Sequence, residues 1–135
     1  MTEMSRIPSI KRSIILLYLM VIVFHVAHIM EEVWGQFLLI RMLGGLSIFL
    51  LINWILLLIP MFLFYFVILD KKWAYYLSVV YVVIMIVNGI GHNIGTLISR
   101  RYFNGYAGGF SGFGLVLSGI PLLYFLLSSL RKRAV

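Results

Sequence analysis

Two short polar motifs stand out in an otherwise apolar sequence. The first is His25-Val-Ala-His28-Ile-Met-Glu31-Glu32, and the second is Asn88-Gly-Ile-Gly-His92. Together they contain all three histidines of the chain and two of its four acidic residues. Imidazole and carboxylate groups are the usual protein ligands of zinc, iron and manganese. These residue types therefore predict a metal site.

Helical spacing sorts the residues of the first motif into two groups. At about 100° per residue, His25, His28 and Glu32 share a wedge of about 60°, and Glu31 is displaced from it. In the second motif, Asn88 and His92 are four residues apart and share a face. The predicted metal ligands are therefore His25, His28, Glu32 and His92.

The two remaining polar residues have predicted roles beside the metal. Glu31 lies off the ligand wedge and is predicted to act as a general base, whereas Asn88 is predicted to orient a ligand. An ion with three protein ligands and an open position can activate water. The predicted cofactor is a divalent metal, with zinc as the first choice and iron or manganese as alternatives.

The same residues also have a purely structural interpretation. A histidine inside a membrane helix is more often a hydrogen-bonded packing residue than a metal ligand. Glu31 and Glu32 could instead form an acidic cap at the membrane interface. In that case their partners would be the arginines Arg41, Arg100 and Arg101.

The composition places these motifs in lipid. Of the 135 residues, 63% are hydrophobic and 11% are charged, and the mean hydropathy is +1.09. Soluble domains are about half apolar and a quarter charged, so most of this chain must be solvated by lipid. The composition excludes a secreted, nuclear or free cytosolic protein. The absence of cysteine from the sequence excludes disulfides and thiolate metal sites.

Charge-free stretches predict four membrane spans. An all-α, integral membrane four-helix bundle is the predicted fold, forming a single domain over residues 1–135. The spans are expected at about 13–30, 46–69, 73–98 and 112–130. Residues 33–45 are predicted to form an interfacial or re-entrant segment, and the glycine- and aromatic-rich stretch 101–114 an interfacial loop or lid.

The basic residues predict how the bundle is oriented. With four spans, eight of the eleven lysines and arginines lie on the side of the two termini and three on the other. The eight are Arg6, Lys11, Arg12, Lys71, Lys72, Arg131, Lys132 and Arg133. Because cytoplasmic loops are rich in lysine and arginine, both termini are predicted to be cytoplasmic, in the plasma membrane. The net charge of +7 is then a topology signal and argues against a nucleic-acid partner.

The depths of the two motifs agree. Counted from the cytoplasmic starts of their spans, His28 and Asn88 each lie about 15 residues along, and Glu32 and His92 about 19. Both motifs are thus expected at one level in the outer half of the membrane. Gly91 and Gly95 form a G-x-x-x-G pattern beside the second motif, which predicts a close approach of another helix.

His28-Ile-Met-Glu31-Glu32 resembles the motif of the HXXEE family, small multi-pass membrane proteins of bacteria and archaea. The later Asn88-to-His92 motif is similar to the second polar element of that family, and the resemblance covers the whole chain in its hydrophobic segments. It implies that His28, Glu31 and Glu32 are signature positions and His92 a companion. It leaves His25 outside the motif and implies no particular activity.

Three functions fit this sequence. The favoured one is a membrane-embedded, metal-dependent enzyme, either a hydrolase or an acid–base catalyst such as an isomerase, that acts on a lipophilic small molecule. The aromatic loop would control access from the outer leaflet. The alternatives are a proton-coupled small transporter and a non-enzymatic accessory protein that binds a metal. Membrane lipids are expected partners, and homo-oligomer formation is left open.

Overall fold

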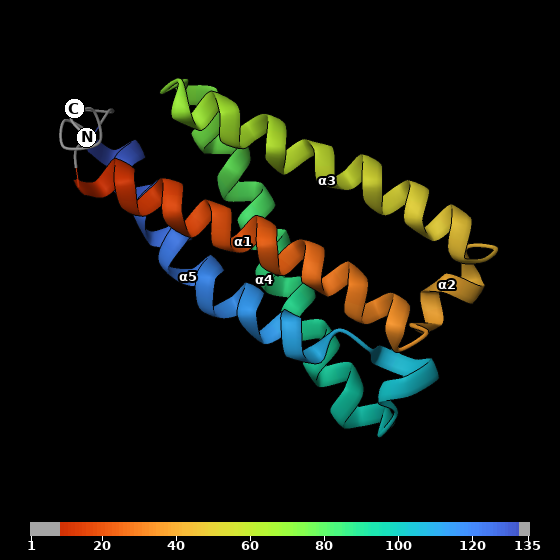
Figure 1. The fold of residues 1–135 in the computed structure, drawn as a ribbon. Coiled ribbons are helices and arrows are strands. Elements are labelled where there is room, and N and C mark those ends of the chain that lie inside the picture. The colour runs from red at the N-terminus through yellow and green to blue at the C-terminus, as the bar shows by residue number, and fades with distance from the viewer. Residues whose placement is uncertain (1–8, 133–135) are drawn as a thin grey trace, which may run out of the picture.

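The computed structural model describes residues 9–132, and this part of the chain contains helices and no strand. The elements are α1 (Ser9–Trp34), α2 (Leu38–Met42), α3 (Leu46–Ile68), α4 (Lys72–Ser99), the irregular segment η2 (Tyr102–Tyr106) and α5 (Gly109–Lys132) (Figure 1). Helices α1, α3, α4 and α5 are each long and apolar enough to cross a membrane. The predicted all-α bundle is confirmed. Arg6 and Arg133, used to predict orientation, lie outside the described residues.

Three of the long helices extend slightly beyond the predicted spans, and α3 ends one residue before the end of its span. The largest difference is in α1, which continues past the last apolar turn to Trp34. Backbone hydrogen bonds hold a helix together whatever the polarity of its side chains, so the helix need not end where the apolar stretch does. As a result, Glu31 and Glu32 lie on regular helix and keep the angular relation to His28 that the spacing predicts.

The two ends of the bundle differ in character. The start of α1, the α3–α4 turn and the end of α5 lie together at one end, and α2 and η2 lie at the other (Figure 1). Lys11 is 4.0 Å from Asp70, which ties the first helix to the α3–α4 turn. This arrangement agrees with four antiparallel spans in which α1 begins and α5 ends on the same side.

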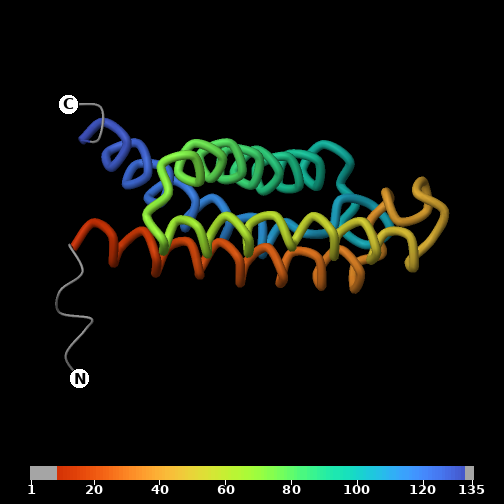
Figure 2. The backbone as a smooth tube through the Cα atoms, turned by 90° about the horizontal axis from the view of Figure 1, so that it is seen from above, coloured from red at the N-terminus to blue at the C-terminus, as the bar shows by residue number. Residues whose placement is uncertain are grey.

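Helices α1, α4 and α5 form the tightly packed part of the molecule. Tyr18, Val82 and Leu115 are fully buried between them, and Figure 2 shows α5 lying between α1 and α4. A Cβ added to Gly112 of α5 would lie 3.0 Å from the carbonyl oxygen of Gly89 of α4, so α4 and α5 are in direct backbone contact. Small residues allow such close packing in membranes.

The predicted helix contact at Gly91 and Gly95 is wrong. A Cβ on Gly91 would meet nothing within 4 Å, and one on Gly95 would collide with the ring of Tyr106 in η2. The close contact with α5 uses Gly89 instead, because that glycine lies on the face of α4 that carries the buried residues Val82 and Met85. The sequence analysis therefore chose the correct helix for the close contact, but it chose glycines on the wrong face of that helix.

Helix α3 packs more loosely than the other three long helices. Only Phe49, Pro60, Leu63 and Val67 are buried among its 23 residues. Most of its large side chains, such as Leu51 and Trp54, are exposed on the surface that lipid would cover. Space therefore remains between α3 and the α1/α4 pair.

The two predicted connectors pack against each other at one end of the bundle. Residues 33–45 contain the short helix α2, and Gly44 and Gly45 have φ values of 94° and 116° where the chain turns into α3. The backbone N–H of Asn104 in η2 donates to the carbonyl oxygen of Gly35 at 2.8 Å, and the Arg41 guanidinium donates to the Asn104 side chain. Both connectors thus lie near the end that contains the polar motifs.

Candidate metal centre

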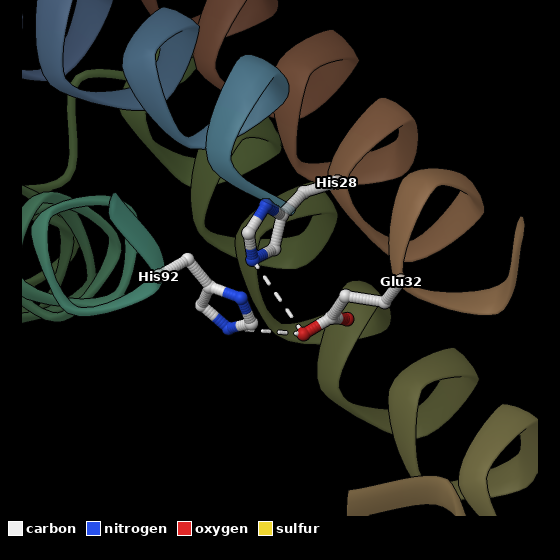
Figure 3. A group of neighbouring side chains, drawn as sticks. All are labelled: His28, Glu32 and His92. Carbon is white, nitrogen blue, oxygen red and sulfur yellow. Dashed lines mark ion pairs between the residues drawn. The ribbon is translucent and has the colours of Figure 1, made fainter. Parts of the chain in front are cut away.

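His28, Glu32 and His92 converge on one buried point (Figure 3). Glu32 Oε1 lies 3.6 Å from His28 Nε2 and 3.2 Å from His92 Nε2. One potential ligand atom from each residue lies within 4.8 Å of the other two, and the three residues are only 1–5% exposed. Helices α1 and α4 therefore bring together three of the four predicted ligands.

The hydrogen bond of His92 fixes which of its ring nitrogens carries the proton. His92 Nδ1 lies 2.5 Å from the carbonyl oxygen of Ala107. A carbonyl oxygen can only accept a hydrogen bond, so Nδ1 must carry the hydrogen and donate it. In the neutral ring, Nε2 then has a free lone pair directed at Glu32.

The two hydrogen bonds of His28 lead to the same tautomer. The amide nitrogen of Asn88 lies 2.9 Å from His28 Nε2, and an amide nitrogen can only donate. Nε2 therefore accepts, and Nδ1 donates to Ser111 Oγ at 3.1 Å. The Ser111 hydroxyl in turn donates to the Glu31 carboxylate. His28 is thus linked through one serine to an anionic group.

These assignments bring three electron-pair donors close together. The His92 Nε2 lone pair and the Glu32 carboxylate would repel each other unless a proton or a cation lies between them. The single lone pair of His28 Nε2 accepts from the Asn88 amide, and it becomes free for a metal once that amide moves aside. Metal-binding histidines usually donate their second ring N–H to a backbone carbonyl or to a carboxylate-linked group, which orients the ring. His92 donates to the Ala107 carbonyl, and His28 donates to Ser111, which is bonded to the Glu31 carboxylate. The donor set therefore fits a divalent metal.

Glu31 points away from this centre and toward α5. Its carboxylate accepts from the backbone N–H groups of Phe110 at 3.0 Å and Ser111 at 2.7 Å, and from the hydroxyls of Ser111 and Tyr102. It therefore caps the first turn of α5, where a negative charge is stabilised by the helix dipole. Its four partners favour an anchoring role over the predicted general base. Within the described part of the chain, Glu31 forms no ion pair with an arginine.

Tyr102 completes the anchor from the η2 segment. Burial raises the pKa of its phenol above the ordinary value, and its hydrogen bond to the Glu31 carboxylate raises that pKa further. The ring of Tyr102 also lies against Phe103 and Trp34, with ring centroids 5.0 and 6.2 Å away. The segment predicted to be an interfacial lid is thus joined to the same glutamate that caps α5.

His25 lies outside the group of three. Its Nδ1 is 3.1 Å from the hydroxyl of Tyr81 on α4, and its ring is buried. Asn88 lies beside the predicted centre, but its amide contacts Nε2, the predicted ligand atom of His28, so it would have to move aside when a metal binds and does not orient that ring. Asn53, on α3, lines a cavity beside the three residues, although its side chain donates to the carbonyl oxygen of Phe49.

A cavity of about 310 Å³ adjoins the three candidate ligands. Five polar side chains from α1 and α4 line it, namely His25, His28, Glu32, Asn88 and His92. The facing walls are largely apolar and include Leu43 of the α2–α3 connection and Ile52 of α3. None of the described residues that line it is a lysine or an arginine. The centre is therefore closed toward α5 and open toward α3.

Three functional residues were missed by the sequence analysis. Ser111 and the Ala107 carbonyl orient the two imidazoles, and Gly108 makes room for them. A Cβ on Gly108 would lie 2.6 Å from His28 Cε1 and 2.8 Å from His92 Nδ1, and its φ is 116°. The only sequence signal was the glycine-rich stretch itself, because a backbone carbonyl has no sequence signature.

Comparisons of the chain with protein-family models, curated proteins and solved structures found no match. The resemblance to the HXXEE family stays a prediction that depends on the residues of the two motifs. The function must therefore be argued from the geometry of the site.

Proposed function

We propose that this chain is a membrane-embedded, metal-dependent hydrolase that acts on a lipophilic substrate. The proposal depends on one observation, the convergence of His28 Nε2, His92 Nε2 and Glu32 Oε1 beside an apolar cavity. Three protein ligands with an open fourth position are typical of catalytic zinc, whereas structural zinc is enclosed by four. Zinc is the first candidate for the metal, and iron or manganese are alternatives.

Each part of the site has a role in this reaction. When bound, the metal would polarise a carbonyl or ester group of the substrate and activate water. Asn88 now donates to His28 Nε2, and once a metal takes that lone pair its amide would be free to donate to a substrate oxygen beside the metal. Ser111 and Ala107 hold the imidazoles in the orientation that binding requires. The apolar walls exclude bulk water, which strengthens the electrostatic interactions inside the cavity.

We place the enzyme in the plasma membrane of a bacterial or archaeal cell with both termini in the cytoplasm. The support is the group of basic residues at the end of the bundle shared by the start of α1, the α3–α4 turn and the end of α5. The metal centre lies toward the opposite end, in the outer half of the membrane. A lipophilic substrate would then reach it from the outer leaflet.

Elemental analysis of the detergent-purified protein tests this proposal. We expect about one zinc, iron or manganese per chain in the wild type, and loss of that metal in His28→Ala. His25→Gln is the matched control, because His25 is a buried histidine on the same helix that bonds to Tyr81. It should keep the metal. Hydrolysis of long-chain ester substrates by the loaded wild type, but not by His28→Ala, would complete the support.

Two results would contradict the proposed enzyme. A folded wild type without metal would favour the proton-coupled transporter, in which the same three atoms share a proton. A stoichiometric metal without any hydrolysis of lipophilic esters would favour the accessory metal-binding protein. Equal metal loss in His28→Ala and His25→Gln would instead return His25 to the ligand set.

A further inference from the structure

A second cavity continues from the metal centre between α3 and α4. It measures about 300 Å³ and shares four lining residues with the first cavity, namely His25, Leu56, Ile84 and Met85. From this junction it extends along the bundle to Leu63 on α3 and Leu77 on α4. The two cavities therefore form one groove with a polar end and an apolar end.

The groove has the length of a lipid chain. Its lining on α3 runs from Phe49 to Leu63, which corresponds to about 21 Å of helix. One leaflet of the hydrocarbon core is about 15 Å thick, so the groove is longer than a leaflet is deep. In its apolar half the polar groups are His25 and Tyr81, and these bond to each other.

We propose that this groove binds one long hydrocarbon chain of the substrate and places its oxygen-bearing head at the metal centre. The substrate is thus a single-chain acyl lipid, such as a long-chain ester. Water cleaves its acyl C–O bond, and the products are a fatty acid, which stays in the groove, and the alcohol, which leaves. This inference depends on the proposed function for the chemistry at the head. The binding of the chain depends only on the shape and polarity of the groove.

The charges at the polar end select the head group. Two neutral imidazoles, one carboxylate and a divalent cation carry a net charge of one positive unit. A carboxylate product balances that charge, and a neutral ester is tolerated. A phosphate-bearing head would need further cationic side chains, and none of the described residues that line the first cavity is a lysine or arginine.

The size of the groove selects one chain over two. Its apolar half measures about 300 Å³ and its polar half about 310 Å³, and in the apolar half all lining residues except His25 come from α3 and α4. The side chains along its edge, such as Leu77, Val80 and Ile84, are about half exposed on the surface that lipid would cover. A single chain can therefore enter sideways from the membrane, and the second chain of a phospholipid would have to stay outside.

Photo-crosslinking with a palmitic acid that carries a diazirine in its chain tests this inference. The probe is added to the metal-loaded, full-length protein in detergent, and the labelled peptides are identified by mass spectrometry. We expect labelling to concentrate on groove residues such as Leu56 and Leu77. An excess of unlabelled palmitate should remove the labelling, and the two-chain lipid dioleoylphosphatidylcholine should not.

A groove-filling substitution provides the matched comparison. Ile84→Trp places a large ring at the junction of the two cavities and should reduce labelling at least tenfold while the metal content stays at the wild-type level. Val87→Trp is the control, because Val87 is 63% exposed on the same helix and lines neither cavity. It should label like the wild type.

The outcomes separate this inference from the proposed function. Diffuse labelling over all exposed faces, or equal competition by the two-chain lipid, in a protein that binds its metal would overturn the groove and leave the hydrolase standing. Groove labelling blocked by Ile84→Trp in a protein without metal would support the groove and contradict the hydrolase. Competition by the isoprenoid alcohol farnesol as strong as that by palmitate would overturn the choice of an acyl chain.

Discussion

The candidate metal centre formed by His28, Glu32 and His92 has two sides that are built differently. On the α5 side, α1, α4 and α5 pack closely. There His28 Nδ1 is hydrogen-bonded to Ser111, and His92 Nδ1 is hydrogen-bonded to the carbonyl oxygen of Ala107. On the α3 side, the two Nε2 atoms and the Glu32 carboxylate adjoin a cavity of about 310 Å³. The neighbouring glutamates divide in the same way, because Glu31 binds the start of α5 and Glu32 faces the histidines.

This difference shows how a small bundle can hold reactive groups in place and still admit a substrate. The filled side fixes the orientation of the ligands through hydrogen bonds, and preorganised ligands cost little to arrange when a metal or substrate binds. The open side leaves coordination positions free. Substitutions on the α5 side should therefore affect stability, metal affinity or both, and those on the α3 side should affect metal or substrate binding with little effect on stability.

The largest effect is expected for Gly108→Ala on the filled side. The added Cβ would displace both imidazoles and strain a backbone with φ of 116°, so the free energy of unfolding should fall by about 2–5 kcal/mol and metal binding should be lost. Gly45→Ala is the control, since its φ is also 116° but its Cβ would meet nothing within 4 Å. Thermal unfolding and metal content, measured in detergent, check both. Equal losses in the two variants would show that only backbone strain matters.

Separate substitutions of Glu31 and Glu32 should distinguish the two sides of the centre by their effects on stability and on metal binding. Glu32→Gln should weaken metal binding at least 100-fold with little loss of stability, because it removes a ligand from the open side. Glu31→Gln should lower the free energy of unfolding by about 1–2 kcal/mol, because it removes the charge that caps α5. Metal titration and chemical unfolding measure the two effects. The comparison fails if Glu31→Gln removes the metal and Glu32→Gln does not.

A smaller effect is expected when the link between Glu31 and His28 is cut. Ser111→Ala should lower metal affinity about 10- to 100-fold, because the ring of His28 loses its orienting partner. Ser111→Thr keeps the hydroxyl and should restore most of the affinity. Ser118→Ala is the matched control on the same helix, since this buried serine donates to the Gly114 carbonyl, away from the metal. Competition with a zinc indicator measures the zinc affinity of all three variants. Equal affinities of Ser111→Ala and Ser118→Ala would show that the contact from Glu31 through Ser111 to His28 does not support metal binding.

The smallest effect concerns Tyr102 and appears at alkaline pH. Burial and the hydrogen bond to Glu31 raise its pKa in the folded state above the ordinary value of about 10. Its contribution to stability is therefore complete below pH of about 10 and is lost as the pH rises above that value. Tyr102→Phe should be slightly less stable at pH 8 and should lose less stability up to pH 11.

Unfolding midpoints across this pH range check the prediction for Tyr102. Tyr124→Phe is the control, because Tyr124 is 67% exposed on α5. It should follow the wild type throughout. If Tyr102→Phe also follows the wild type, Tyr102 does not stabilise the Glu31 anchor.

The fold and the centre of the site followed from local patterns. Charge-free stretches located the four long helices, because a bilayer requires long apolar helices. The spacing of His28, Glu32 and His92, together with their equal depth, placed them near one another. Periodicity along a helix is a property of the sequence alone, and this is why these three residues could be grouped in advance.

The rest depended on contacts between distant parts of the chain. His25 shares the angular wedge of His28, but Tyr81 across the interface gives it another partner. The roles of Ser111 and the Ala107 carbonyl arise from the way the start of α5 packs on α1 and α4. The choice of Gly89 over Gly91 as the contact glycine was also decided by helix rotation, which no spacing within α4 reveals.

The most direct test of the metal centre is X-ray absorption spectroscopy of the zinc-loaded protein. We expect a first shell of nitrogen and oxygen at about 2.0–2.1 Å with two imidazoles per zinc. This spectrum should be unchanged in His25→Gln and should show one imidazole in His92→Gln. Three imidazoles in the wild type, with one lost in His25→Gln, would contradict the centre formed by His28, Glu32 and His92.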